Sequence, residues 1–374
     1  MNLLLILLLS VYLILVLILW NGWKKIESLP RETYREEDFP EVSIIIPVRN
    51  EANNVGNLLQ DLEKQDYPGN KYEVLIIDDA SEDNTVEIIN GLNSSLEVKL
   101  YPLIPTSFRS KKKAAITQGV NIAKGELILC TDGDTRVGPK WVKSMVSQLD
   151  VNKHKFISGP VNLQPANSLI AKIQQIEFLS LIGAGAASIY YKLPNMCNGA
   201  NMAFSKSAFE KVRGYRGKED IPSGDDEFLM HKINKAFPRS IKFLKDDQAI
   251  VKTSPATSIR SFYSQRKRWA GKWKYYDIWQ PKILAGFIFT VQLALLLSLF
   301  AVIIDLISIQ IFISIISIKY LVDYLYLNSL TRFFKHKVNL LAFTVLQIVY
   351  PLYIIVIGLT STFGPYSWKG RRYD

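Results

Sequence analysis

Residues 42–51 read Val-Ser-Ile-Ile-Ile-Pro-Val-Arg-Asn-Glu, and residues 127–134 read Leu-Ile-Leu-Cys-Thr-Asp-Gly-Asp. In both stretches an apolar run passes directly into polar residues, as it does in strands that are buried on both faces of a parallel sheet. Further apolar runs at residues 74–77 and 98–100 alternate with polar stretches of helical character, which are residues 51–65, 84–91 and 111–123. This βαβα order predicts an α/β domain with a mostly parallel sheet covered by helices.

Polar residues follow three of these apolar runs, at the edge of the sheet where ligands bind in such folds. They are Pro47 to Glu51, the pair Asp78 and Asp79, and the Asp132-Gly133-Asp134 triplet. Two carboxylates one residue apart can approach one hard cation, and Mg²⁺ or Mn²⁺ takes one or two protein carboxylates and fills its other sites with water and phosphate oxygens. The alternative is that these acidic residues are turn and helix-capping residues.

Residues 223–227 read Ser-Gly-Asp-Asp-Glu and precede a helical stretch. Acidic residues at a helix N-terminus interact favourably with the helix dipole, and this structural explanation suffices for the segment taken alone. The functional alternative is a general base, for which one carboxylate must lie within hydrogen-bond reach of an attacking hydroxyl.

Residues 260–274 hold six cations, four aromatic residues and no acid, and they directly precede a hydrophobic C-terminal region. Such a segment is typical of a lipid headgroup surface. Arg268 beside Trp269 could also present its fork of donors to a diphosphate, so both interpretations stay open.

The composition excludes several classes of protein. The chain has 374 residues, of which 48% are hydrophobic and 21% charged, so it is neither disordered nor collagen-like. Two cysteines and three histidines without metal-site spacing argue against a zinc site or a disulfide scaffold. The net charge of +11 is divided between the two parts of the chain on either side of residue 281, so neither part indicates nucleic-acid binding.

Three uncharged segments are long enough to cross a bilayer, namely residues 1–20, 283–304 and 338–368. Lys24 and Lys25 follow the first segment instead of preceding it, which predicts an uncleaved anchor over residues 1–23. The positive-inside rule then places the N-terminus outside and the main domain in the cytoplasm. We therefore predict a multi-pass protein of the cytoplasmic membrane.

The C-terminal region, residues 282–361, has an ambiguous topology. Its hydrophobic length allows two spans with a turn near Asp305 and a third after residue 338, which would put the tail outside. The basic tail, residues 362–374, favours the cytoplasmic side, so one hydrophobic segment is expected to be re-entrant or to lie in the interface. We also predict interfacial helices over residues 167–191 and 258–276, with ordinary core packing as the alternative for the first.

The order of these motifs resembles the membrane-associated family 2 glycosyltransferases, which have a GT-A fold. The resemblance covers about residues 40–275 and includes the D-x-D and Q-x-x-R-W patterns of that family. The residues that carry it are Pro47 to Glu51, Asp78-Asp79, Lys112-Lys113, Asp132-Gly133-Asp134, Gly224-Asp225-Asp226 and Gln265-Arg266-Lys267-Arg268-Trp269.

The resemblance implies a role for each of these positions. One group of residues would bind the nucleoside and the diphosphate of the donor. A second group would bind a divalent cation, Mg²⁺ or Mn²⁺, and one carboxylate would act as the general base. Pro47, Glu51, Asp79, Lys112 or Lys113, and Asp132 would bind the nucleotide, Asp134 with Asp132 would bind the metal, Asp226 would deprotonate the acceptor, and Gln265, Arg268 and Trp269 would close the site.

The resemblance further implies an inverting transfer of sugar from a nucleoside-diphosphate sugar, UDP-linked in most such enzymes, to a lipid, isoprenoid or membrane-bound glycan. Three or four hydrophobic spans are too few to build a polymer channel alone, which favours the addition of one or a few sugars over a short-chain polysaccharide synthase. Membrane lipids are expected partners. The competing hypotheses are a non-catalytic membrane subunit that retains a nucleotide-sugar-binding fold and a nucleotidyltransferase.

Overall fold

The structure is a computed structural model that describes residues 2–27, 39–92, 96–147, 153–362, 366–368 and 371–373. The chain divides into two compact units, each of which we describe by itself. The first, called the sheet unit, comprises Ile26–Gln164 and Ile189–Ser254. The second, called the helical unit, comprises Met1–Lys25, Pro165–Ser188 and Pro255–Asp374.

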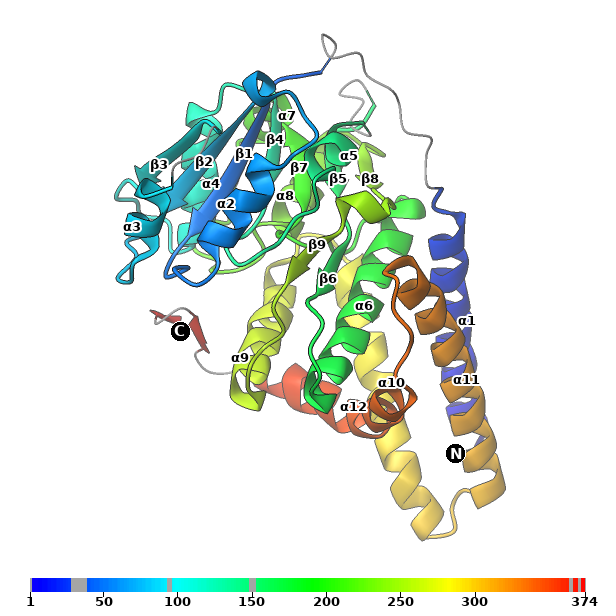
Figure 1. The fold of residues 1–374 in the computed structure, drawn as a ribbon. Helices are drawn as coiled ribbons and strands as arrows, with labels where there is room; N and C mark the ends of the chain where they lie inside the picture. The colour runs from blue at the N-terminus through cyan, green and yellow to red at the C-terminus, as the bar shows by residue number, and fades with distance from the viewer. Residues whose placement is uncertain are drawn as a thin grey trace. The chain divides into compact units, whose positions relative to one another are not determined.

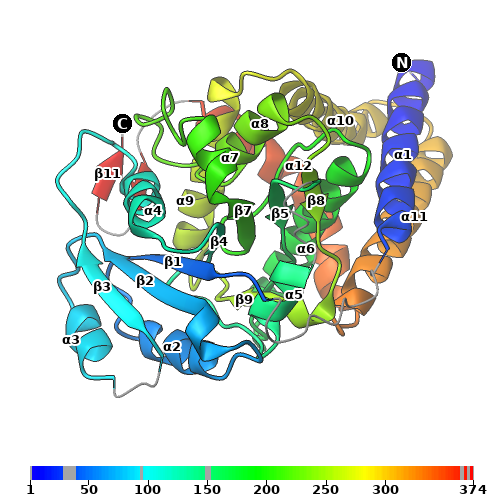
Figure 2. The ribbon, with the colours of Figure 1, turned by 90° about the horizontal axis from the view of Figure 1, so that it is seen from above.

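The sheet unit is built on one sheet with the strand order β3-β2-β1-β4-β7-β5-β8 (Figures 1 and 2). The strands are β1 (Val42–Val48), β2 (Tyr72–Asp78), β3 (Val98–Pro102), β4 (Leu127–Cys130), β5 (Phe156–Ser158), β7 (Met202–Ser205) and β8 (Ile241–Phe243). A parallel pair, β6 (Val161–Leu163) and β9 (Val251–Thr253), stands outside this sheet.

The first half of the sheet confirms the alternation seen in the sequence. β1 pairs in parallel with both β2 and β4, and β2 pairs in parallel with β3. The helices between these strands are α2 (Val55–Glu63), α3 (Thr85–Asn90) and α4 (Lys111–Ile122), each within a few residues of its predicted range. This half supplies the three carboxyl ends at which the site residues were predicted.

The second half of the sheet is mixed. β7 runs antiparallel to β4 and to β5, and β8 is parallel to β5. Helices α5 (Trp141–Ser147), α7 (Lys206–Lys211) and α8 (Glu227–Ala236) and the short 3₁₀ helices η2 (Gly69–Lys71) and η3 (Asp247–Ala249) complete the sheet unit. The fold is therefore a mostly parallel α/β sheet, as predicted, in which β7 is the strand that runs antiparallel to its two neighbours.

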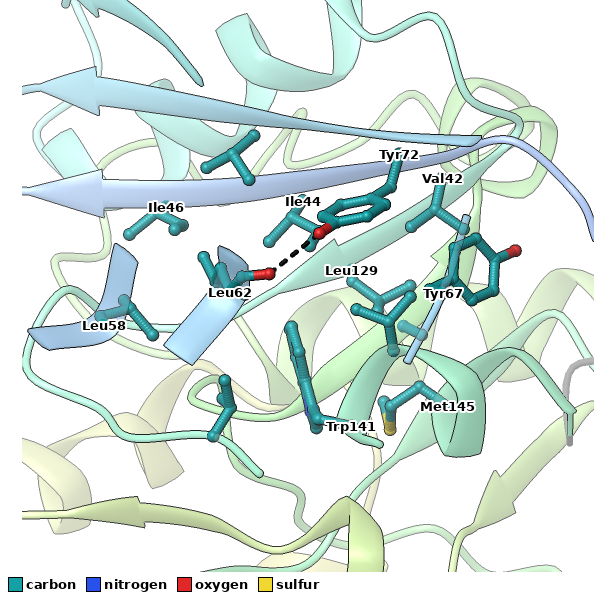
Figure 3. Packing of buried hydrophobic residues seen from close by; sticks show 14 of the residues in the cluster. Val42, Ile44, Ile46, Leu58, Leu62, Tyr67, Tyr72, Leu129, Trp141 and Met145 are labelled. Atoms are coloured by element: carbon teal, nitrogen blue, oxygen red, sulfur yellow. Dashed lines mark hydrogen bonds between the residues drawn. The ribbon is translucent and has the colours of Figure 1, made fainter. Parts of the chain in front are cut away.

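The core on one side of the sheet joins β1 to α2 and α5 (Figure 3). Ile44 and Ile46 of β1 meet Leu58 and Leu62 of α2, and all four are fully buried. Burial of each such side chain stabilises the fold by roughly 1.5–3 kcal/mol. The Tyr72 hydroxyl donates to the Leu62 carbonyl at 2.9 Å, which pins the end of α2 to the sheet.

Among the described residues of the helical unit, five helices are long and apolar enough to cross a membrane. They are α1 (Asn2–Lys25), α6 (Leu169–Tyr190), α10 (Gln280–Ile303), α11 (Ile309–Phe333) and α12 (Leu340–Thr360). The predicted turn near Asp305 is confirmed, because α10 and α11 are joined there and Asp305 has a φ of +54°. The unit also holds α9 (Ile259–Ala270), η4 (Gly271–Tyr275) and the strands β10 (Tyr366–Trp368) and β11 (Arg371–Tyr373).

Three details bear on the predicted membrane topology. The helix predicted over residues 167–191 forms as α6. Its own apolar residues are distributed around the whole helix instead of along one face, so α6 is not amphipathic. Gly183 of α6 lies so close to α11 that a Cβ would come within 2.6 Å of Leu330 and Tyr326, which makes it a helix-packing residue. In Figure 1, α12 runs across α10 instead of alongside it. The side of the membrane on which the tail lies stays a prediction.

Candidate functional site

β2 ends in a tight turn that gives Asp78 and Asp79 different roles. The Asp78 carboxylate accepts hydrogen bonds from the Ser81 hydroxyl at 2.5 Å and from the Ser81 N–H at 3.2 Å. Ala80 lies between them in the left-handed region, with a φ of +51°. The Asp79 N–H donates to the Val48 carbonyl at 2.9 Å, so it continues the sheet. Asp78 forms the turn, and the predicted nucleoside contact rests on the buried Asp79.

Arg49 joins the carboxyl ends of β1 and β2, a role that the sequence analysis did not assign to it. Its Nη1 donates to the carbonyls of Asp79 and Ala80, both at 2.7 Å, and its Nη2 lies 2.8 Å from the Glu82 carboxylate. A cation directly after a buried strand, beside a neighbouring acidic turn, was the signal in the sequence that could have revealed it.

Glu51 connects the end of β1 to the D-x-D loop. It is buried, and its carboxylate accepts a hydrogen bond from the Asn54 amide at 2.8 Å. A Cβ on Gly133 would lie 3.0 Å from the Glu51 side chain, so these two segments are in close contact. Pro47 lies two residues beyond Ile45, the last residue of β1 that pairs with β4, so its missing N–H does not interrupt that pairing.

The D-x-D loop that follows β4 is fixed by two buried threonines. The hydroxyls of Thr131 and Thr135 lie 2.8 Å apart, and Thr131 also donates to the Ala200 carbonyl at 2.8 Å. Asp132 and Asp134 themselves stay partly exposed. The loop backbone is therefore held rigidly, while its two carboxylates remain accessible to a ligand.

Lys112 joins the D-x-D loop to the loop before α8. Its Nζ lies 2.6 Å from an oxygen of Asp132 and 2.9 Å from an oxygen of Asp225. Burial alone would lower the pKa of Lys112, but the charges of Asp132 and Asp225 outweigh it and keep that pKa above its ordinary value. Burial would likewise raise the pKa of Asp225, and the charge of Lys112 holds it below the usual range. Lys112 and Asp225 are therefore both charged at neutral pH.

Lys113, the neighbour of Lys112, has a different environment. Its side chain is fully buried, and its ammonium donates to the carbonyls of Lys218 at 2.9 Å and Ile221 at 2.7 Å. Its Nζ also lies 4.9 Å from the centre of the Phe228 ring. Lys113 thus supports the segment that leads to Asp225, and Lys112 is the lysine beside the acidic residues.

Asp226, the predicted base, is the N-cap residue that directly precedes α8. One carboxylate oxygen accepts from the Glu227 N–H at 2.7 Å, and the other accepts from the Gly199 N–H at 3.0 Å. A Cβ at position 199 would come within 2.7 Å of Asp225 Oδ2, so only glycine fits this approach. The carboxylate is partly exposed and held in one orientation, as a general base requires.

The remaining predicted residues, Gln265, Arg268 and Trp269, lie on α9 in the helical unit. They are partly exposed, whereas Arg266 between them is buried. The structure thus brings together Glu51, the D-x-D loop, Lys112 and Asp226 in the sheet unit and assigns the Q-x-x-R-W residues to the other unit.

The donor set at the sheet edge fits Mg²⁺ or Mn²⁺. Among the described residues, no group of three or more His, Cys, Asp or Glu side chains could hold a metal ion by itself. That is compatible with a cation of this kind, which binds one or two carboxylates and takes further oxygens from substrate phosphates. Asp134 and Asp132, both partly exposed on a rigid loop, are the residues suited to this role.

Comparison with known proteins gives four relevant similarities, of which one is to a family model, two are to curated proteins and one is to a solved structure. Residues 43–213 match the family model described as "Glycosyl transferase family 2". The chain is 28% identical over 238 residues to the poly-beta-1,6-N-acetyl-D-glucosamine synthase of Staphylococcus epidermidis, a match that covers 61% of this chain and 53% of that protein. It is 33% identical over 195 residues to the glycosyltransferase AglE of Haloferax volcanii, covering 52% of this chain and 58% of that protein.

The chain therefore spans little more than half the length of these curated relatives. Among solved structures, it resembles the mannosyltransferase PcManGT from Pyrobaculum calidifontis in complex with GDP-Man and Mn²⁺. The two structures superpose with a TM-score of 0.63 at 19% identity, over 97% of this chain and 99% of that one. This similarity shows a shared fold over nearly the whole chain.

Proposed function

Because the chain contains a glycosyl transferase family 2 domain with a GT-A fold, we propose that it is an inverting, metal-dependent glycosyltransferase of a membrane. The donor is a nucleoside-diphosphate sugar, UDP-linked as the family resemblance implies, and the acceptor is a lipid, an isoprenoid or a membrane-bound glycan. One observation carries the proposal. Lys112 joins Asp132 and Asp225, and the oriented carboxylate of Asp226 follows Asp225 directly in the chain.

On the donor side, we assign the nucleoside to Glu51 and Asp79, which lie at the ends of adjacent parallel strands. The diphosphate is assigned to the D-x-D loop and to Lys112. When bound by Asp134 and Asp132, Mg²⁺ or Mn²⁺ would supply positive charge to the departing diphosphate. PcManGT is described with GDP-Man and Mn²⁺, which supports the metal but makes a GDP-linked donor the necessary comparison in any assay.

On the acceptor side, we assign the proton transfer to Asp226. Its carboxylate takes the proton from the acceptor hydroxyl, and the oxygen then attacks the anomeric carbon from the face opposite the diphosphate. The new glycosidic bond forms as the bond between the anomeric carbon and the diphosphate breaks, and the diphosphate leaves with the electron pair. Gln265, Arg268 and Trp269 keep the role that the Q-x-x-R-W resemblance implies, which is to close the site.

The membrane part of the proposal rests on the five apolar helices of the helical unit. We place the sheet unit and the basic tail in the cytoplasm. The cations that follow α1 favour this side by the positive-inside rule, and it is also the side on which nucleotide sugars would be available. Polymer synthesis is the second candidate, because one relative is a poly-beta-1,6-N-acetyl-D-glucosamine synthase. It differs in outcome, since repeated transfer would give a ladder of products instead of one or a few additions.

The test is nucleoside-diphosphate release by the purified full chain in nanodiscs, with UDP- and GDP-sugars, candidate acceptor lipids, and Mn²⁺ or EDTA. Asp226→Asn should lower turnover about 10²–10⁴-fold, because the variant lacks the general base. The matched control is Asp220→Asn, since Asp220 is exposed and lies six residues earlier in the chain. Near wild-type turnover by Asp226→Asn would refute the assigned base, and nucleotide binding without transfer would favour the non-catalytic subunit.

A further inference from the structure

Arg266 is the one residue of α9 that is buried in the helical unit. Its partner is Glu177 of α6, and the side chains of both are only 4% exposed. The Arg266 Nε lies 3.0 Å and 3.2 Å from the two oxygens of Glu177, and its Nη2 donates to one of the same oxygens. This bidentate pairing fixes both the distance between the two side chains and the orientation of the guanidinium plane, which a lysine could not do.

The same guanidinium touches the two ends of the Q-x-x-R-W motif. Its Nη1 donates to the side-chain oxygen of Gln265, and its central carbon lies 4.3 Å from the centre of the Trp269 ring. Phe262, one turn earlier, stacks on the guanidinium at 4.5 Å. Residues three and four apart are neighbours on a helix, so Arg266 orders the face of α9 that carries Trp269.

Glu177 also connects this pair to a third helix. The Tyr353 hydroxyl of α12 donates to Glu177 Oε1 at 3.1 Å, and the Tyr353 ring stacks on Phe262 with 5.7 Å between ring centres. The α6 and α12 helices are both apolar enough to be membrane spans. The free-energy cost of desolvating two buried charges offsets much of their attraction, so a buried ion pair adds little to stability. A better-supported role for such a pair is to select one geometry among competing ones.

We propose that Arg266 and Glu177 are positioning residues that hold Gln265 and Trp269 in the orientation needed for transfer. Neither residue touches the substrate. Arg266 acts through the two motif residues it contacts, and Glu177 acts by orienting Arg266 against α6 and α12. This inference rests on the proposed glycosyltransferase activity and on the role of the Q-x-x-R-W motif in it.

The test is a double-mutant cycle on turnover with the full chain in nanodiscs. Arg266→Lys keeps the charge but loses the fork, so kcat should fall about 10-fold or more while the donor KM stays within about 2-fold, as expected for misplaced groups. Arg216→Lys is the matched control, because Arg216 is exposed in the sheet unit. In a Gln265→Ala background, Arg266→Lys should lower kcat less than about 3-fold further, because residues that act as a unit are not additive.

Glu177→Gln, with Glu210→Gln as its control at an exposed site, should reproduce the loss of kcat. The inference is overturned if Arg266→Lys turns over like wild type, or if its effect multiplies fully with that of Gln265→Ala. A loss of kcat that follows the fraction of unfolded protein would also overturn it. An inactive wild-type chain would refute the proposed function instead, so the two failures are distinguishable.

Discussion

A lysine lies between polar partners in two regions of this molecule, and the two networks differ in how completely they are enclosed. At the sheet edge, Lys112 pairs with Asp132 and Asp225, and the Asp132 side chain is 33% exposed. In α11 of the helical unit, Lys319 pairs with Asp323 at 2.7 Å, and these side chains are only 7% and 8% exposed.

The Lys319 network closes on itself across three apolar helices. Lys319 donates to Gln347 of α12 at 2.6 Å, Gln347 donates to Asp323 at 3.1 Å, and the Tyr12 hydroxyl of α1 donates to the other Asp323 oxygen at 2.9 Å. Lipid offers no hydrogen bonds, so polar groups at membrane depth must satisfy one another. The comparison teaches that a closed network holds helices together, whereas an open one leaves carboxylate oxygens for a ligand.

The largest expected effect is on stability and concerns the closed network. Asp323→Asn should lower the free energy of unfolding by about 3–5 kcal/mol, because it leaves the buried Lys319 without its countercharge. Denaturation in bicelles would measure it, with Asp305→Asn in the exposed α10–α11 turn as the control. Turnover per folded molecule should stay the same. If Asp323→Asn is as stable as wild type, the closed network does not hold the helices.

The next effect is on catalysis and concerns the open network. Lys112→Met should lower turnover about 100-fold, because it removes a fixed positive charge from the place where the diphosphate gains negative charge. Donor titrations and melting curves would separate turnover from folding, and Lys64→Met, at an exposed position, is the control. A variant that melts early but turns over normally when folded would make Lys112 a structural residue like Lys319.

The smallest effect concerns Glu73, which is enclosed at the opposite end of β2. Its carboxylate accepts from the Ser43 hydroxyl at 2.7 Å and from the Lys124 N–H at 2.8 Å, and Lys99 lies 3.1 Å away. Burial alone would raise the pKa of Glu73, but these donors hold it below its usual value. The stabilisation is therefore present above the ordinary glutamate pKa and is lost as the pH falls through the lowered one.

Glu73→Gln should consequently cost about 1–2 kcal/mol of unfolding free energy at pH 7, and the difference from wild type should shrink as the pH falls through the lowered pKa of Glu73. Melting curves over a pH series would measure this, with Glu210→Gln as the control. A difference that persists unchanged at low pH would contradict the assignment. Glu73 lies in the sheet unit and not in an apolar helix. The result would therefore also show whether burial of a polar network is enough for it to stabilise the fold without a membrane.

Much of the fold could be predicted, because each strand of the parallel half of the sheet is a short apolar run followed by polar residues, a pattern that is local in the sequence. The apolar runs at residues 42–46, 74–77 and 127–130 all became strands, and the polar residues after them lie where each strand ends. The mixed half could not be predicted from such patterns, because the pairing of β5, β7 and β8 joins segments that lie far apart in the chain.

The amino-acid sequence by itself determined which residue types stand at the strand ends and which three segments are uncharged over a length that can cross a membrane. Only the tertiary structure decided between neighbours of the same type. Lys112 faces carboxylates while Lys113 faces carbonyls, and Arg266 is buried while Arg268 is partly exposed. Successive helical residues point about 100° apart, so which of the two faces is covered depends on packing partners far away in the chain.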